Sequence, residues 1–191
     1  MIVKCTTAAA ITPFSLDEVK AHLRVSHTEE DAYITTLISA VTSIAENYIG
    51  RALFTSTWKF YLENFCKRKV TLPFPPLQSI TSVRYYNGES WVTMGSDEYQ
   101  VDNVSEPGLI VPAAGGVWPV VDVQTINPIE ITFVAGYGAR SELPPALRQA
   151  LLYHITHLYD IREPVVIGTL AMKIPHTLID IYQPYRILEF T

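Results

Sequence analysis

Charged residues and cysteine are both scarce in this sequence. Only 17% of the 191 residues are Asp, Glu, Lys or Arg, whereas an average soluble domain has about 25%. The hydrophobic fraction is 48%, which excludes an intrinsically disordered chain and suggests that partners bury part of the surface. Cys5 and Cys66 are too few and too far apart for a disulfide framework or a zinc site, so a reducing cytoplasm is expected.

Long hydrophobic runs are also missing. No stretch of about 18 apolar residues occurs. Lys4 is followed by small and polar residues rather than by the apolar core of a signal peptide. We therefore expect no membrane partner and a protein that is soluble and intracellular when it is synthesised.

Basic residues are absent from residues 85–139, which hold seven acids. Together with the formal net charge of −5, this argues against a protein that grips nucleic acid by counterion release. Asp97, Glu98 and Asp102 in this stretch are conceivable as an acid/base or metal set, but they are more simply a solvated acidic face of a strand.

One basic cluster, Lys67-Arg68-Lys69, precedes a predicted strand. A protein that binds nucleic acid would need several such basic patches with aromatic residues between them. The cluster is therefore interpreted either as a solvated loop tip or as an electrostatic contact with an acidic partner.

Local signals predict helices at both ends of the chain. The segment Ser15-Leu16-Asp17-Glu18 is a capping box that opens a short helix to about Arg24. The apolar period and the acids of its first turn predict a second helix over about 28–49, which Gly50 ends. Pro144-Pro145 opens a third helix to about Ile161, and a last one is expected over about 176–182.

Between these helices the apolar period changes to two. Trp58, Phe60 and Leu62 alternate with more polar residues, as in a half-buried strand. Asn87-Gly88 predicts a hairpin with a type I′ turn, because these residues accept positive φ angles. The hairpin strands would be 80–86 and 89–94, and further strands are expected at 98–104, 108–112 and 128–135.

These elements predict an α+β fold. The N- and C-terminal helices, in residues 1–52 and 140–191, should pack as a small helical bundle and form one discontinuous domain. Residues 53–139 would be an inserted antiparallel β region.

Few residues suggest catalysis. His154 and His157 are three apart on a predicted helix and Asp160 continues the row, so a metal site is conceivable. The Glu of an H-E-x-x-H motif and a clear third ligand are missing, which favours packing or surface histidines. Gly136-Tyr137-Gly138 lacks the rest of a nucleotide-binding loop and is interpreted as a turn that ends a strand. We expect no enzyme, no cofactor and no metal.

Aromatic residues are plentiful, with three Trp and eleven Tyr. Aromatic side chains are enriched in the cores of protein interfaces, because a rigid ring buries much area for little lost entropy. Partner contacts and core packing are both open explanations for them.

Several segments together carry a family resemblance. They are SLDEVKAHLRV at 15–25, the helix from Asp31 to Glu46, GRAL at 50–53, TW at 57–58, LPFPPL at 72–77, VRYY at 83–86, WP at 118–119, ITFVAGYG at 131–138, LPPALRQA at 143–150, YDIRE at 159–163 and PYR at 184–186. In this order and spacing the chain resembles the phage head-tail connector proteins, also called gp6-like or adaptor proteins, in their larger variants with a β insertion. The similarity covers nearly the whole chain.

The resemblance implies a structural virion protein at the head-tail junction of a phage or prophage-derived particle. Such proteins form rings, typically twelve-fold, that dock on the portal protein, extend the DNA channel and carry the next connector or the tail. The family has no catalytic residues. The C-terminus of smaller members reaches into the portal. The candidate partner contacts here are Lys67, Arg68, Lys69, Pro184, Tyr185 and Arg186.

A channel for moving DNA should not bind it tightly, because each base on a phosphate would slow translocation. We therefore expect part of the acidic region, with Asp97, Glu98 and Asp102 as candidates, to face the channel. The alternatives are a DNA-packaging accessory, a tail-completion protein and, less favoured, a metal-dependent hydrolase. The isolated protein can be a monomer if it joins its ring late.

Overall fold

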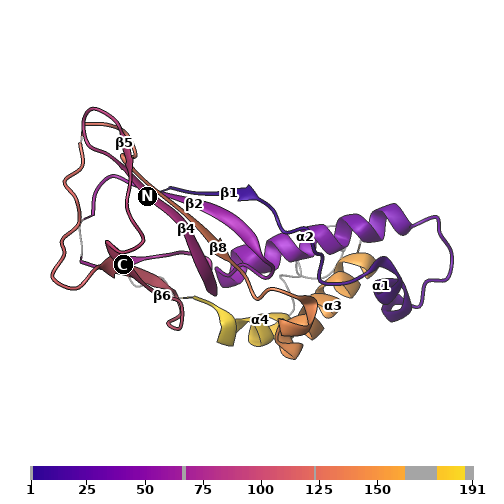
Figure 1. The fold of residues 1–191 in the computed structure, drawn as a ribbon. Coiled ribbons are helices and arrows are strands. Elements are labelled where there is room, and N and C mark those ends of the chain that lie inside the picture. Colours follow the sequence, from indigo (N-terminus) through magenta and orange to yellow (C-terminus); the bar gives the residue numbers. More distant parts are fainter. Residues whose placement is uncertain (1, 66–67, 123, 162–175, 188–191) are drawn as a thin grey trace. The chain divides into compact units, whose positions relative to one another are not determined.

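A computed structural model describes residues 2–65, 68–122, 124–161 and 176–187 of the chain. The chain divides into two compact units, drawn in Figure 1. The sheet unit comprises residues 1–10 and 54–137, and the helical unit comprises residues 11–53 and 138–191. Each unit is described by itself.

The sheet unit contains two antiparallel sheets. The larger sheet has the strand order β1-β2-β8-β4-β5. Its strands are β1 (Ile2–Thr7), β2 (Ser56–Leu62), β4 (Leu77–Tyr86), β5 (Trp91–Thr93) and β8 (Ile129–Ala135). The smaller sheet has the order β3-β7-β6. Its strands are β3 (Val70–Thr71), β6 (Tyr99–Asp102) and β7 (Leu109–Pro112).

The central strand β8 organises the core of the larger sheet. Its side chains alternate between buried and partly exposed positions, as expected when one face of a strand meets a core. In register across the sheet, Phe60 of β2, Ile131 of β8 and Val83 of β4 form a buried row. The alternation that predicted a half-buried strand at Phe60 is confirmed.

Most of the expected strands are present, with differences at turns and edges. The strands expected at 98–104, 108–112 and 128–135 are confirmed as β6, β7 and β8. The strand β3 lies directly after the basic cluster, where a strand is expected. The strand β1 has no counterpart among the expected strands, and it places the first residues of the chain in the sheet unit rather than with the helices.

The hairpin at Asn87-Gly88 exists, but its turn differs from the prediction. Tyr86 pairs with Trp91, so the loop spans four residues, 87–90, and is not a two-residue type I′ turn. The Asn87 side chain explains the longer loop, because its Oδ1 accepts the backbone N–H groups of Glu89 and Ser90, each at 2.9 Å.

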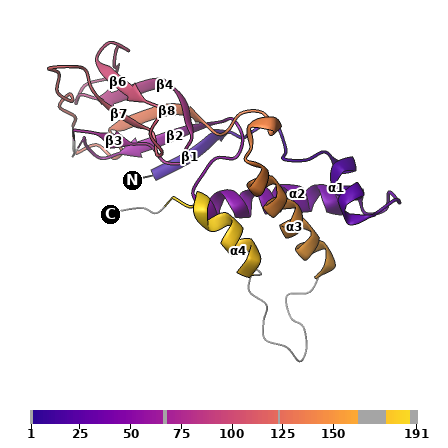
Figure 2. The same cartoon turned by 90° about the horizontal axis from the view of Figure 1, so that it is seen from below.

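The helical unit contains four α-helices among its described residues, shown in Figure 2. They are α1 (Leu16–Leu23), α2 (Asp31–Ile49), α3 (Pro145–Asp160) and α4 (His176–Tyr182). Two short 3-10 helices accompany them, η1 (Arg140–Glu142) and η2 (Gln183–Tyr185). The expected helices are confirmed in number and order, and helices with antiparallel sheets confirm the α+β class.

The local signals that bound these helices act as predicted, with one exception. Ser15 and Glu18 form the capping box of α1, and Gly50 ends α2 with a positive φ of 69°. Helix α2 begins at Asp31 rather than Thr28. The preceding residues are held as a turn instead, since the Asp31 N–H donates to the Thr28 carbonyl and the Tyr159 hydroxyl binds the Glu30 carboxylate.

The helices pack as a bundle through apolar stripes. Helix α2 packs against α3, α3 against α4, and α1 against α2. The stripes consist of fully buried residues at three- and four-residue steps, such as Ile34, Val41 and Ala45 on α2 and Leu147, Leu151 and Ile155 on α3.

Candidate interaction surfaces

The basic cluster lies directly before β3 in the sheet unit. Arg68 and Lys69 are exposed, and no described residue forms an ion pair with either; Lys67 lies outside the described residues. The Trp118 indole N–H donates to the Arg68 carbonyl at 2.9 Å. The same indole stacks on Phe65, with the ring centroids 4.4 Å apart. The backbone at Arg68 is therefore held by the loop between β7 and β8, while the side chains of Arg68 and Lys69 face solvent.

The predicted acidic residues flank β6. Asp97 is exposed. Glu98 accepts the Gly95 N–H at 2.6 Å, which closes the turn before the strand. Asp102 accepts the N–H groups of Val104 and Ser105, each at 2.9 Å, and so closes the turn after it.

Asp102 remains ionised in this turn. Hydrogen bonds from the Ser105 hydroxyl and from the Ser105 and Val104 N–H groups lower the pKa of its carboxyl. The structure thus brings Asp97, Glu98 and Asp102 to one strand, and it gives Glu98 and Asp102 a turn-forming role besides their charge. An aspartate followed three residues later by serine is the sequence signal for such a turn.

The base-free stretch is not uniformly negative in three dimensions. Glu130 of β8 lies 3.0 Å from the Lys59 ammonium of β2 and 3.7 Å from the Arg84 guanidinium of β4. Asp122 accepts the Gln124 N–H and the Thr125 hydroxyl in a turn. Neighbouring strands therefore neutralise Glu130, and the uncompensated charge concentrates around β6.

The C-terminal candidates lie on the helical unit, at the end of α2. Pro184 and Tyr185 form part of η2, and Arg186 follows it. The Arg51 Nε donates to the Tyr185 carbonyl at 2.6 Å. The Ile187 N–H donates to the Ile49 carbonyl at 2.8 Å.

These bonds fix the backbone of the C-terminal segment and leave two of its side chains available. Pro184 and Arg186 are exposed, and the Arg186 guanidinium lies 5.4 Å from the centroid of the Tyr48 ring. Arg51, which holds the segment, is itself 8% exposed. Sequence reasoning did not assign Arg51 this role, because its partner is a backbone carbonyl far along the chain.

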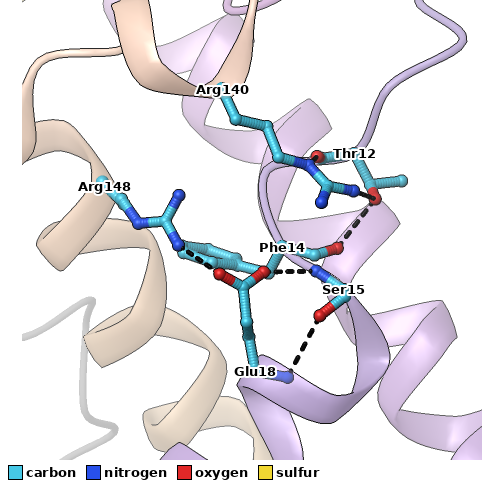
Figure 3. Close-up of polar contacts among 6 residues, drawn as sticks. All are labelled: Thr12, Phe14, Ser15, Glu18, Arg140 and Arg148. Carbon is cyan, nitrogen blue, oxygen red and sulfur yellow. Dashed lines mark hydrogen bonds and ion pairs between the residues drawn. The ribbon is translucent and has the colours of Figure 1, made fainter.

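Two arginines, Arg140 and Arg148, hold the start of helix α1 and the residues before it, as Figure 3 shows. Glu18 accepts the Ser15 N–H at 2.7 Å with one carboxylate oxygen and Arg148 at 2.6 Å with the other. The Arg148 guanidinium also lies over the Phe14 ring, 4.8 Å from its centroid. The pKa of the Glu18 carboxyl is lowered below its usual value. The hydrogen bond from the Ser15 N–H is the main cause, and the bond from Arg148 adds to it.

Arg140 holds the segment that precedes α1. The Arg140 Nε donates to the Thr12 carbonyl at 2.7 Å, and the Thr12 hydroxyl donates to the Phe14 carbonyl at 2.8 Å (Figure 3). These residues are structural: they join the N-terminal helix α1 to the segment that leads into α3.

The histidines of α3 do not form a metal site with described residues. His154 is 2% exposed, and its Nδ1 has no hydrogen-bond partner in the described part of the chain. It packs near the Tyr182 ring of α4, with the centroids 6.3 Å apart. Burial, and the nearby His157, lower the pKa of His154. No group of three or more His, Cys, Asp or Glu within the described ranges is placed to hold a metal.

The most exposed apolar side chains of the sheet unit lie on its loops. They are Val104, Val117, Val120 and Ile126. The aromatic side chains, which we had considered as interface residues, are largely used inside the unit: Trp58 stacks on Phe74 with the centroids 4.2 Å apart, and Trp118 stacks on Phe65. The most exposed apolar side chains of the sheet unit are therefore aliphatic, although Trp91 remains 42% exposed.

No helix among the described residues is long and apolar enough to cross a membrane.

Comparisons with known proteins agree with this arrangement. Residues 14–105 match the family model of phage gp6-like head-tail connector proteins. No curated protein matches the chain.

Solved structures share the fold over the whole chain. A chain from the neck of an empty gene transfer agent (GTA) particle, computed with C6 symmetry, and one from the virion of a native GTA particle each give a TM-score of 0.82. A chain from the neck of a native GTA particle, computed with C12 symmetry, gives 0.76. Each is 22% identical, and the match covers 100% of this chain and 98% of the other.

The family match includes the capping box of α1, helix α2 and the strands β2 to β6, and the remaining elements complete a fold found in particle necks. The chain is therefore similar to the phage gp6-like head-tail connector family over residues 14–105, and this similarity supports a structural connector role.

Proposed function

We propose that the protein is a non-enzymatic virion component of the neck, which assembles as a ring on the portal protein, extends the DNA channel and provides the platform for the next connector or the tail. The observation that carries this proposal is the match of residues 14–105 to the connector family. The similarity to chains from GTA necks computed with C6 and C12 symmetry supports a ring, twelve-fold in the particle.

The surface chemistry fits a ring subunit. A ring contact between identical subunits joins two different faces of the chain, so each subunit has two surfaces to bury. Val104, Val117 and Val120 project from loops with almost no intramolecular cover. Such side chains are ordinary in a subunit whose neighbours cover them.

Two further surfaces are assigned within this proposal. The C-terminal segment, which includes Pro184, Tyr185 and Arg186, contacts the portal. The basic cluster, with Arg68 and Lys69, contacts an acidic partner. Part of the acidic region around β6, for which Asp97, Glu98 and Asp102 are the candidates, faces the channel. Uncompensated carboxylates there would repel the duplex and leave it mobile.

Negative-stain imaging of the purified protein, alone and mixed with the portal protein of the same particle, tests the proposal. Rings, or a collar on the portal, support it. An inert monomer in both samples would overturn it. A DNA mobility-shift assay at several salt concentrations distinguishes the main alternative, because a packaging accessory would bind DNA in a salt-sensitive way and a passive channel would not.

A further inference from the structure

The smaller sheet has two free edges of opposite chemical character. In the order β3-β7-β6, the strand β7 is central, and no described strand pairs with the outer edge of β3 or of β6. Adjacent strands lie about 5 Å apart, so the two edges are about 10 Å from each other and face opposite ways. Both edge strands are short, with two residues in β3 and four in β6, so the side chains along the edges, rather than extended strand pairing, would carry a contact.

The edge at β6 is acidic and apolar. A row of side chains in register crosses the sheet from Val70 through Ile110 to Val101. The row is 8% exposed at Val70 and 0% at Ile110, but 41% at Val101. Val104, directly after the strand, is 89% exposed. Asp97 and Glu98 flank the other end of the strand.

The edge at β3 is basic and apolar. Arg68 and Lys69 precede this strand and are exposed. Trp118 holds the backbone at Arg68, and the two valines near Trp118 in the sequence, Val117 and Val120, are 86% and 90% exposed. Each edge thus combines uncovered valines with charges of one sign, and the signs are opposite.

We infer that these two edges are the complementary faces of the subunit contact: the β6 edge of one copy binds the β3 edge of the next copy in the ring. This inference rests on the proposed function and names the partner of the basic cluster as a second copy of this chain. The faces differ, so the contact is head-to-tail and repeats around a closed ring. Valines supply the buried apolar area, and the opposed charges fix which edges meet.

Charge reversal gives a test with an internal rescue. Arg68→Glu with Lys69→Glu makes both edges acidic. Asp97→Lys with Glu98→Gln makes the end of the β6 edge at residues 97–98 basic as well, leaves Asp102 in place and keeps an acceptor for the Gly95 N–H. Each variant alone should lose ring or collar formation, whereas an equal mixture should restore it, because acidic and basic subunits then alternate. An even-numbered ring closes with such alternation.

The apolar part of the contact is tested by single substitutions. Val104→Asp or Val117→Asp should raise the protein concentration needed for assembly by about tenfold or more. Both side chains are exposed in the monomer, so thermal melting should not change. Ile126→Asp is the matched control: Ile126 is 87% exposed but lies in the segment bonded to the β4–β5 hairpin, whose Tyr86 N–H donates to the Pro128 carbonyl. Lys4→Glu on β1 is the control for a charge reversal elsewhere on the sheet unit, and it should leave assembly unchanged.

The readouts are negative-stain imaging and sedimentation velocity of each protein, alone and with the portal protein. If the wild type forms neither ring nor collar, the proposed function fails. If the wild type assembles and the edge variants assemble equally well, or the mixture of reversed variants does not recover, the inference about the edges is wrong while the proposed function stands. Loss of assembly in the Ile126→Asp control would also overturn it.

Discussion

Gly136, the residue directly after β8, gives the sharpest test of the sheet unit. Its φ is +124°, and a Cβ added there would lie 2.3 Å from both the carbonyl carbon and the carbonyl oxygen of Phe54. These are backbone atoms, which cannot rotate away. The Gly136 N–H also donates to the Pro76 carbonyl, and its own carbonyl accepts the Gln78 side chain. Gly136→Ala must therefore displace the junction between β8 and the start of β2.

The expected size of the effect follows from two contributions. A non-glycine residue in a left-handed conformation costs about 1–2 kcal/mol, and forcing an extra carbon into a filled site costs about 1–3 kcal/mol. Gly136→Ala should lower the free energy of unfolding by about 2–5 kcal/mol. Gly115, with a φ of +78° and no atom within 4 Å of an added Cβ, is the matched control. Gly115→Ala should show only the conformational cost, about 1–2 kcal/mol.

The assay uses the placement of the tryptophans. All three, Trp58, Trp91 and Trp118, belong to the sheet unit, so urea unfolding followed by tryptophan fluorescence reports on this unit. Far-ultraviolet circular dichroism follows the helices in the same samples. Equal losses in the two variants would refute the backbone clash. A Gly136→Ala variant as stable as the wild type would also refute the interpretation of Gly136-Tyr137-Gly138 as a structural turn.

Three further predictions concern the helical unit. Ser15→Ala removes half of the capping box and should cost about 1 kcal/mol, measured by urea unfolding of the helical signal; no loss would contradict the role of the cap. Arg51→Met keeps an apolar stem but removes the donor to the Tyr185 carbonyl, so a loss of about 1.5–3 kcal/mol and faster carboxypeptidase digestion are expected, and unchanged digestion would be the contrary result. Burial lowers the pKa of His154 from 6.5, so the unfolded chain takes up this proton more readily, and stability should fall as the pH drops below about 6.5. His154→Phe should reduce that fall, and equal pH profiles of melting temperature would contradict the assignment.

Elements bounded by local signals were predictable from the sequence. The capping box at Ser15 and Glu18 needs only residues three apart, and Gly50 ends α2 through its own backbone freedom. The period of two in β8 likewise depends on neighbouring residues alone. The strand β1 lacked such a signal, because it is defined by its pairing with β2, in which Cys5 lies opposite Trp58. Pairing across such a distance in sequence leaves no local pattern.

The interaction surfaces were predictable only in part. The sequence located the charges at Arg68, Lys69, Asp97 and Glu98, but it did not show that they flank opposite edges of one small sheet, which depends on the order β3-β7-β6. The turn at Asp102 could be predicted from the sequence, because Ser105 follows three residues later. The burial of Arg51 had no signal in the sequence, since a charged residue is expected at the surface until its backbone partner is known.

The proposed edge contact bears on the main physical difficulty of a DNA channel in this chain. A basic cluster repeated on every subunit of a ring would place many cations near a duplex, and each phosphate contact would slow its passage. If the β3 edge of each copy meets the β6 edge of the next, Arg68 and Lys69 are opposed by the neighbour's Asp97 and Glu98 and are not available to phosphates. Within a subunit, Glu130 likewise neutralises basic side chains, because it forms ion pairs with Lys59 and Arg84. The base-free stretch 85–139 would then serve two purposes in the ring: its carboxylates would neutralise the bases of the sheet unit at the subunit contacts, and the remainder, including the ionised Asp102, would keep the channel repulsive to DNA.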